Sequence, residues 1–197
     1  PRYDIAIRPP RGQVTELSST QLAPGATLAI PPTLLANLMP GAVLSASAGS
    51  VARFDAAALM RALDAWAYGC LEQAVSRGLP LTVAADESLV GERRRERLGQ
   101  SVATVLGRQR YDGAFGLWSA FGAAEPWLSP YAVEFLLRAR AAGVSVPDAP
   151  LDAALRYLTD QVGDLPGNNA NADWAAHAYA QYVLAMAGRP RPGGRAR

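Results

Sequence analysis

Apolar residues three or four positions apart recur through most of the chain, and this spacing predicts amphipathic helices. The expected helical segments are 56–66, a short element ending soon after 74–75, 88–108, 130–142, 151–162 and 172–187. Gly78 and Pro80 are expected to end the second segment, and Ser129 is expected to cap the fourth, with Pro130 at its first position. The chain is therefore predicted to be mainly α-helical.

Residues 1–52 have a different pattern. Alternating apolar and polar residues predict strands at 3–7 and 26–30, with a third at 43–46. Proline and glycine pairs separate them as turns, and a short helical turn is expected at 34–38. Three strands are too few to form a stable sheet alone. We therefore expect 1–52 to be a β-rich segment at the end of a flanking, upstream β-domain.

Composition is that of a globular protein, with 50% apolar and 18% charged residues in 197. No run of 18 apolar residues predicts a membrane span, and no signal peptide is visible at Pro1, so an excerpt from a longer chain is expected. The mixed run around 92–97 is typical of a solvated helix face. The net charge of +2 does not favour nucleic-acid binding. No cofactor and no metal are expected.

The last residues, 189–197, alternate Arg with Pro and Gly, which predicts a disordered tail.

Candidate chemistry lies in the hexapeptide Tyr68-Gly69-Cys70-Leu71-Glu72-Gln73, which holds the only cysteine. Residues three apart on a helical turn are neighbours, so the Cys70 thiol can reach the side-chain amide of Gln73. Attack there with loss of ammonia gives an internal thioester. Gly69 is expected to supply a backbone torsion that glycine adopts easily, and Glu72 points away from the reacting face. A lone cysteine is, however, also typical of a small buried core residue.

This hexapeptide resembles the thioester motif of bacterial α2-macroglobulins. Leu71 places the likeness in the bacterial branch, because eukaryotic members usually have Gly there. Further family-like runs follow in the family's order, at 108–109, 112–118 and 126–131, and the segment 21–50 resembles the β-segment before the thioester domain. The resemblance implies that 53–188 is a thioester domain built as the first half of an α/α toroid.

The resemblance also implies function. In the family, a protease cuts a bait segment, the domains shift, and the thioester captures the protease through a lysine amine. The chain would then be a single-use protease inhibitor rather than an enzyme. Its partners would be target proteases and other domains of the same protein, acting in bacterial defence from the periplasm as an inner-membrane-anchored lipoprotein.

Six aromatic residues are candidates for a pocket that keeps water from the thioester, although each alone is also typical of a packed core. They are Trp66, Tyr68, Phe115, Trp118, Trp127 and Tyr131. Some relatives place a histidine near the thioester to redirect the acyl group to hydroxyls. The only histidine here, His177, lies inside an apolar helix and is expected to be a packed or solvent-edge helix residue. Direct aminolysis is therefore the expected chemistry.

Two other interpretations stay open. The first is an α/α-toroid enzyme, which would need metal ligands or paired carboxylates at the toroid mouth, whereas the acidic residues here are scattered. The second is a non-reactive structural or interaction module in which Cys70 is inert.

Overall fold

The protein is described by a computed structural model, which divides it into two compact units, Pro1–Ala48 and Gly49–Arg197. Each unit is described by itself. The residues whose structure is described are 16, 18–36, 38–42, 44, 46, 48–49, 63, 69–83, 87–163 and 171–190.

The described part of the first unit contains one short helix, α1 (Pro32–Leu35), close to the predicted helical turn. Two glycines with positive φ, Gly25 and Gly41, form turns at the predicted breakpoints. The segment 26–30 forms no strand. A strand requires a paired neighbour for its backbone hydrogen bonds, and the partners were expected elsewhere in the β-domain. The predicted strand at 3–7 lies outside the described residues, and 43–46 is described only at two positions.

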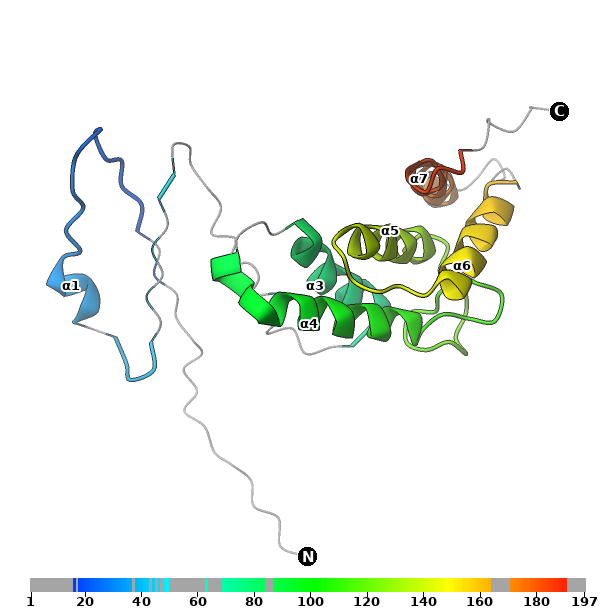
Figure 1. The fold of residues 1–197 in the computed structure, drawn as a ribbon, viewed down its shortest axis with the longest axis horizontal. Coiled ribbons are helices and arrows are strands. Elements are labelled where there is room, and N and C mark those ends of the chain that lie inside the picture. Colours follow the sequence, from blue (N-terminus) through cyan, green and yellow to red (C-terminus); the bar gives the residue numbers. More distant parts are fainter. Residues whose placement is uncertain are drawn as a thin grey trace, which may run out of the picture. The chain divides into compact units, whose positions relative to one another are not determined.

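The described part of the second unit is helical, which confirms the mainly α prediction (Figure 1). Its helices are α3 (Leu71–Val83), α4 (Glu87–Leu106), α5 (Leu128–Ala141), α6 (Asp148–Gln161) and α7 (Asn171–Met186). The predictions for 88–108 and 172–187 agree with α4 and α7 to within about two residues, the usual uncertainty of helix ends. The predicted helix 56–66 lies almost entirely outside the described residues.

These helices alternate between two layers. α3 packs on α5 and α5 packs on α7, so every second helix shares a layer. α4 covers α3 and α5, and α6 covers α5 and α7. Buried aliphatic residues and Phe115 and Phe135 fill the space between the layers. The packing order therefore places the start of α3 beside α5 and the loop that precedes α5.

The sequence prediction for the end of α3 was wrong, because the helix continues through both Gly78 and Pro80. Gly78 is buried, and a Cβ atom there would lie 2.5 Å from Cε2 of Phe135. Its role is to let α5 approach α3 closely. Pro80 removes one backbone hydrogen bond from the helix, and α3 ends three residues later, at Val83.

Ser129 was also assigned the wrong role. Helix α5 begins at Leu128, and no side chain caps it. The Ser129 hydroxyl is fully buried and accepts a hydrogen bond from the Phe115 backbone N–H at 3.1 Å. Ser129 therefore fixes the loop between α4 and α5 against the core.

The basic run on α4 is only partly a solvated face. Arg94 donates hydrogen bonds to the carbonyl oxygens of Leu81 (2.7 Å) and Thr82 (3.4 Å), which lie in the last turn of α3. A cation at a helix C-terminus satisfies free carbonyl groups and interacts favourably with the helix dipole.

Near the C-terminal end of the described residues, Arg189 forms an ion pair with Asp152 of α6 at 2.6 Å. Residues 191–197 of the predicted tail lie outside the described residues.

Candidate functional site

Cys70 stands immediately before the first turn of α3. Its carbonyl oxygen accepts the hydrogen bond from the Ala74 N–H at 3.0 Å, which makes Cys70 the N-cap residue of the helix. Cys70 is buried, with 7% of its surface exposed. Gln73 is then the third residue of the helix. Cys70 therefore stands at the end of α3 whose free backbone N–H groups favour negative charge.

This register gives the Cys70–Gln73 pair the spacing of a capping box, in which a Gln at the third helical position reaches back to the N-cap residue. The Gln73 side-chain oxygen is buried and has no hydrogen-bond partner among the described residues. A buried acceptor without a partner is costly. A thioester carbonyl oxygen is a weaker acceptor than an amide oxygen, so conversion to a thioester reduces that cost.

Three hydrogen bonds fix the backbone on both sides of Cys70. Arg108, just after α4, donates from Nη2 to the Gly69 carbonyl oxygen. The Leu71 N–H donates to the Leu117 carbonyl oxygen at 2.8 Å, and Arg77 Nε donates to the Gln73 carbonyl oxygen at 3.3 Å. The start of α3 is thus held by α4 and by the loop before α5.

The expectation for Gly69 was wrong. Gly69 does not have a positive φ, and a Cβ atom there would lie at an ordinary contact distance of 3.6 Å from Arg108 Nη2. The chain enters α3 through an N-cap, which any residue with extended torsions can provide, and not through a tight left-handed turn. Sequence analysis did not find the contributions of Arg108, Arg77 and Leu117, because all three act on or through backbone groups.

The aromatic candidates have different surroundings. Trp66 and Tyr68 lie outside the described residues. Phe115 is fully buried in the core, whereas Trp118 is 67% exposed. Trp127 and Tyr131 line a cleft of about 240 Å³ together with Glu72 and Ser76 of α3, and the Tyr131 hydroxyl is hydrogen-bonded to Ser76 at 3.1 Å.

His177 lies in α7, is 5% exposed and shares a hydrogen bond of 2.8 Å with Gln181, so it is a packed helix residue as expected. A partly buried polar contact joins α7 to α5. The Tyr179 hydroxyl donates to Glu134, whose carboxylate also pairs with Arg138 at 2.7 Å. Burial, followed by the bond to Glu134, raises the pKa of Tyr179 far above its usual value. Tyr179 therefore stays protonated and keeps donating, which ties α7 to the helix beside the site.

The loop that holds Leu71 contains its own ion pair. Arg110 donates to both carboxylate oxygens of Asp112, at 3.2 Å to each from Nε, and the Ala114 N–H donates to Oδ1 at 3.1 Å. The hydrogen bond from Arg110, with a smaller contribution from the Ala114 N–H, lowers the pKa of Asp112 below its usual value.

We expect Asp112→Asn to reduce stability at neutral pH but not at low pH. Because the folded-state pKa is lowered, the carboxylate stabilises the fold above its unfolded pKa of about 3.9, and this contribution is lost as the pH falls through the folded value. The pair is partly exposed, so a Tm decrease of only about 2–4 °C is expected at pH 7. Thermal unfolding at pH 7 and at about pH 2 measures the difference. Asp160→Asn controls for the lost charge, and an equal Tm decrease at both pH values contradicts the prediction.

No model of a protein family matches the chain. Escherichia coli K12 alpha-2-macroglobulin is 34% identical over 205 aligned positions, which include 93% of this chain. The chain belongs to the bacterial alpha-2-macroglobulin family. It spans 12% of the length of that relative, so it corresponds to one segment of a much longer protein.

Solved structures of bacterial alpha-2-macroglobulins have the same fold. Salmonella alpha-2-macroglobulin reacted with methylamine is 34% identical, with a TM-score of 0.62 over 68% of this chain and 10% of that chain. Trypsin-activated E. coli alpha-2-macroglobulin is 33% identical, with a TM-score of 0.54 over 64% of this chain and 10% of that one. Separately, none of the described helices is long and apolar enough to cross a membrane.

Proposed function

We propose that this chain carries an internal thioester between Cys70 and Gln73 and that the thioester captures attacking proteases covalently. The observation that carries the proposal is the position of a buried cysteine at the N-cap of α3, with a glutamine at the third helical position whose side-chain oxygen is buried and unpartnered. The chain is then the thioester domain of an alpha-2-macroglobulin protease inhibitor.

The bond forms by addition of the Cys70 sulfur to the side-chain carbonyl carbon of Gln73. The carbon–nitrogen bond of the amide breaks, and the thiol proton leaves with the nitrogen as ammonia. In capture, a lysine amine of the protease attacks the same carbon, the carbon–sulfur bond breaks, and a proton passes to the sulfur. A new amide bond then joins Gln73 to the protease, and Cys70 is a free thiol.

The helix start supports both steps. As the carbon–sulfur bond breaks, negative charge develops on sulfur, and a helix N-terminus stabilises negative charge. The hydrogen bonds from Arg108, Leu71 and Arg77 hold the flanking backbone in place, which reduces the entropy lost when the two side chains meet. The chemistry matches the relative that was reacted with methylamine, a small primary amine.

Exclusion of water is the second requirement, because a thioester hydrolyses when it is wet. Cys70 and Leu71 are buried within this chain, and Trp127 and Tyr131 lie beside the first turn of α3. Trp118, Phe121 and Tyr111 are largely exposed. An exposed aromatic loop is typical of a surface that another domain covers, so we propose that other domains of the full-length protein complete the shield.

The two-layer alternation of α3 to α7 also fits an arc of an α/α toroid, in which consecutive helices alternate between an inner and an outer ring.

Target proteases are the proposed partners, as for the E. coli relative activated by trypsin. The periplasmic, membrane-anchored location stays a prediction that fractionation of cells would test.

Intact-protein mass spectrometry tests the thioester directly. The expected mass of the untreated protein is lower than its sequence mass by one ammonia. Methylamine should raise that mass by one methylamine and release one titratable thiol. A protein with full sequence mass and an immediately titratable Cys70 would show that the bond is absent.

A further inference from the structure

The cleft of about 240 Å³ beside the first turns of α3 combines aromatic rings with a carboxylate. Its lining residues, which come from α3, the start of α5 and α7, are Glu72, Ser76, Trp127, Leu128, Tyr131 and Tyr179. Three of these residues are aromatic, one is acidic and none is basic. Pockets for drug-sized ligands are larger than this cleft, so its size suits a single side chain.

Glu72 supplies the negative charge of the cleft. It is the second residue of α3 and is exposed. Within the part of the chain that the structure describes, no hydrogen bond or ion pair engages its carboxylate. Because Glu72 directly precedes Gln73, this charge stands one residue away from the proposed acyl group. The cleft therefore lies beside the thioester position and not on it.

Contacts within the chain hold the aromatic side chains of the cleft in place. The Tyr131 hydroxyl is hydrogen-bonded to the Ser76 hydroxyl at 3.1 Å, and the Tyr179 hydroxyl donates to Glu134. The ring centroids of Trp127 and Tyr179 are 4.9 Å apart, while 51% of Trp127 is exposed. A preorganised site of this kind loses little conformational entropy when a ligand binds.

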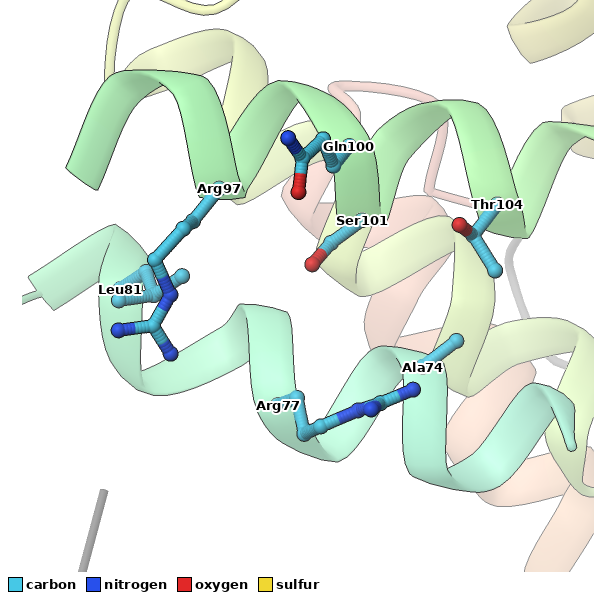
Figure 2. A pocket seen from close by; sticks show the side chains of 7 residues that line it. All are labelled: Ala74, Arg77, Leu81, Arg97, Gln100, Ser101 and Thr104. Carbon is cyan, nitrogen blue, oxygen red and sulfur yellow. The ribbon is translucent and has the colours of Figure 1, made fainter. Parts of the chain in front are cut away.

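The opposite side of α3 has a different charge. A groove of about 190 Å³ between α3 and α4 is lined by Arg77 of α3 and Arg97 of α4 (Figure 2). Both arginines already interact within the chain, and the lining of this groove includes no carboxylate. A cation that approaches the start of α3 is therefore better accommodated at Glu72 than in the groove on the α4 side.

We propose that the cleft at Glu72 binds a lysine ammonium group of the captured protein and so holds the target while a neighbouring lysine amine attacks Gln73. An ammonium group pairs with a carboxylate and is attracted to the faces of aromatic rings. The apolar stem of a lysine side chain also packs on aromatic surface. The bound lysine stays protonated and forms no covalent bond, whereas the second lysine forms the amide in the capture step described above.

This inference rests on the proposed thioester and adds a preference for targets that carry two lysines close together. Diamines test it, because they carry a second cationic group that a neutral amino alcohol of the same length lacks. The rate of thiol release from the protein is measured with cadaverine and aminopentanol, and with the longer pair octanediamine and aminooctanol. After correction for its two amines, at least one diamine is expected to react about fivefold faster than its amino alcohol.

Two cleft variants should lose this advantage of the diamine. Glu72→Gln removes the charge and Trp127→Leu removes an aromatic ring, and in each the ratio of the two rates is expected to fall to within about twofold of unity. The rate with methylamine, measured for every variant, corrects for any change in the reactivity of the thioester itself. Glu96→Gln, at an exposed position of α4 outside the cleft, is the matched control and should keep the parent ratio.

The outcomes separate this inference from the proposed function. If methylamine releases a thiol but neither diamine reacts faster than its amino alcohol, the inference is overturned and the thioester stands. The inference is also overturned if Glu72→Gln keeps the parent ratio, or if Glu96→Gln lowers it equally, since the attraction would then be diffuse. If no amine releases a thiol, the proposed thioester is wrong and this inference falls with it.

Discussion

Replacing Gln73 with glutamate is expected to abolish covalent capture of trypsin. A glutamate carboxylate is ionised at neutral pH and resists attack by a thiol, and it has no ammonia to release, so the thioester cannot form. The variant should have its full sequence mass and one immediately titratable thiol. Denaturing electrophoresis after incubation with trypsin should show no band at the combined mass of the two proteins.

The matched control is Gln100→Glu, which makes the same chemical change at an exposed position of α4. This variant should form the thioester and capture trypsin like the parent protein. Circular dichroism should show that both variants fold, although Gln73→Glu is expected to lower the unfolding temperature, because it places a carboxylate where the Gln73 side-chain oxygen is buried without a partner among the described residues. Covalent capture by Gln73→Glu at the parent level would mean that the acyl group comes from a different residue, and the proposed function would be wrong.

Replacing Gly113 with alanine is expected to lower the free energy of unfolding by about 3 kcal/mol or more, from backbone strain and overpacking together. Gly113 has a φ of +90°, and a Cβ atom there would lie 2.3 Å from the carbonyl oxygen of Ala153 in α6. That oxygen belongs to helix backbone and cannot move aside as a side chain can. Urea denaturation followed by circular dichroism measures the change.

Gly143→Ala separates the two contributions. Gly143 has a similar φ of +84°, but no atom lies within 4 Å of the position of its added Cβ. The Gly143→Ala variant should have a free energy of unfolding lower by about 1–2 kcal/mol, which is the cost of the left-handed conformation alone. If the two variants lose equal stability, close packing of the Gly113 loop on α6 does not add to the effect of the Gly113→Ala substitution. The Gly113 loop also carries Gln109, whose amide donates to the Pro150 carbonyl oxygen at 2.8 Å, so local loosening should reach α6.

Much of the fold could be predicted from periodicity, because amphipathic helices require apolar residues at regular spacing. The predictions for α4 and α7 are correct within about two residues. The errors occurred where one residue type has two physical roles. Glycine and proline often end helices, but Gly78 allows Phe135 to approach. Serine often caps helices, but Ser129 is a buried acceptor for the Phe115 N–H. Sequence cannot choose between such roles, because the choice depends on distant neighbours.

By itself, the sequence determined the helical class and the family, and it predicted the pair Cys70 and Gln73, because spacing and a rare motif depend only on the order of residues. Only the tertiary structure decided that Cys70 is a buried N-cap, that Arg108 and Leu117 hold the backbone beside it, and that two arginines share a groove between α3 and α4. Those features depend on backbone carbonyl groups and on helices packed side by side, and neither leaves a pattern in the order of side chains along the chain.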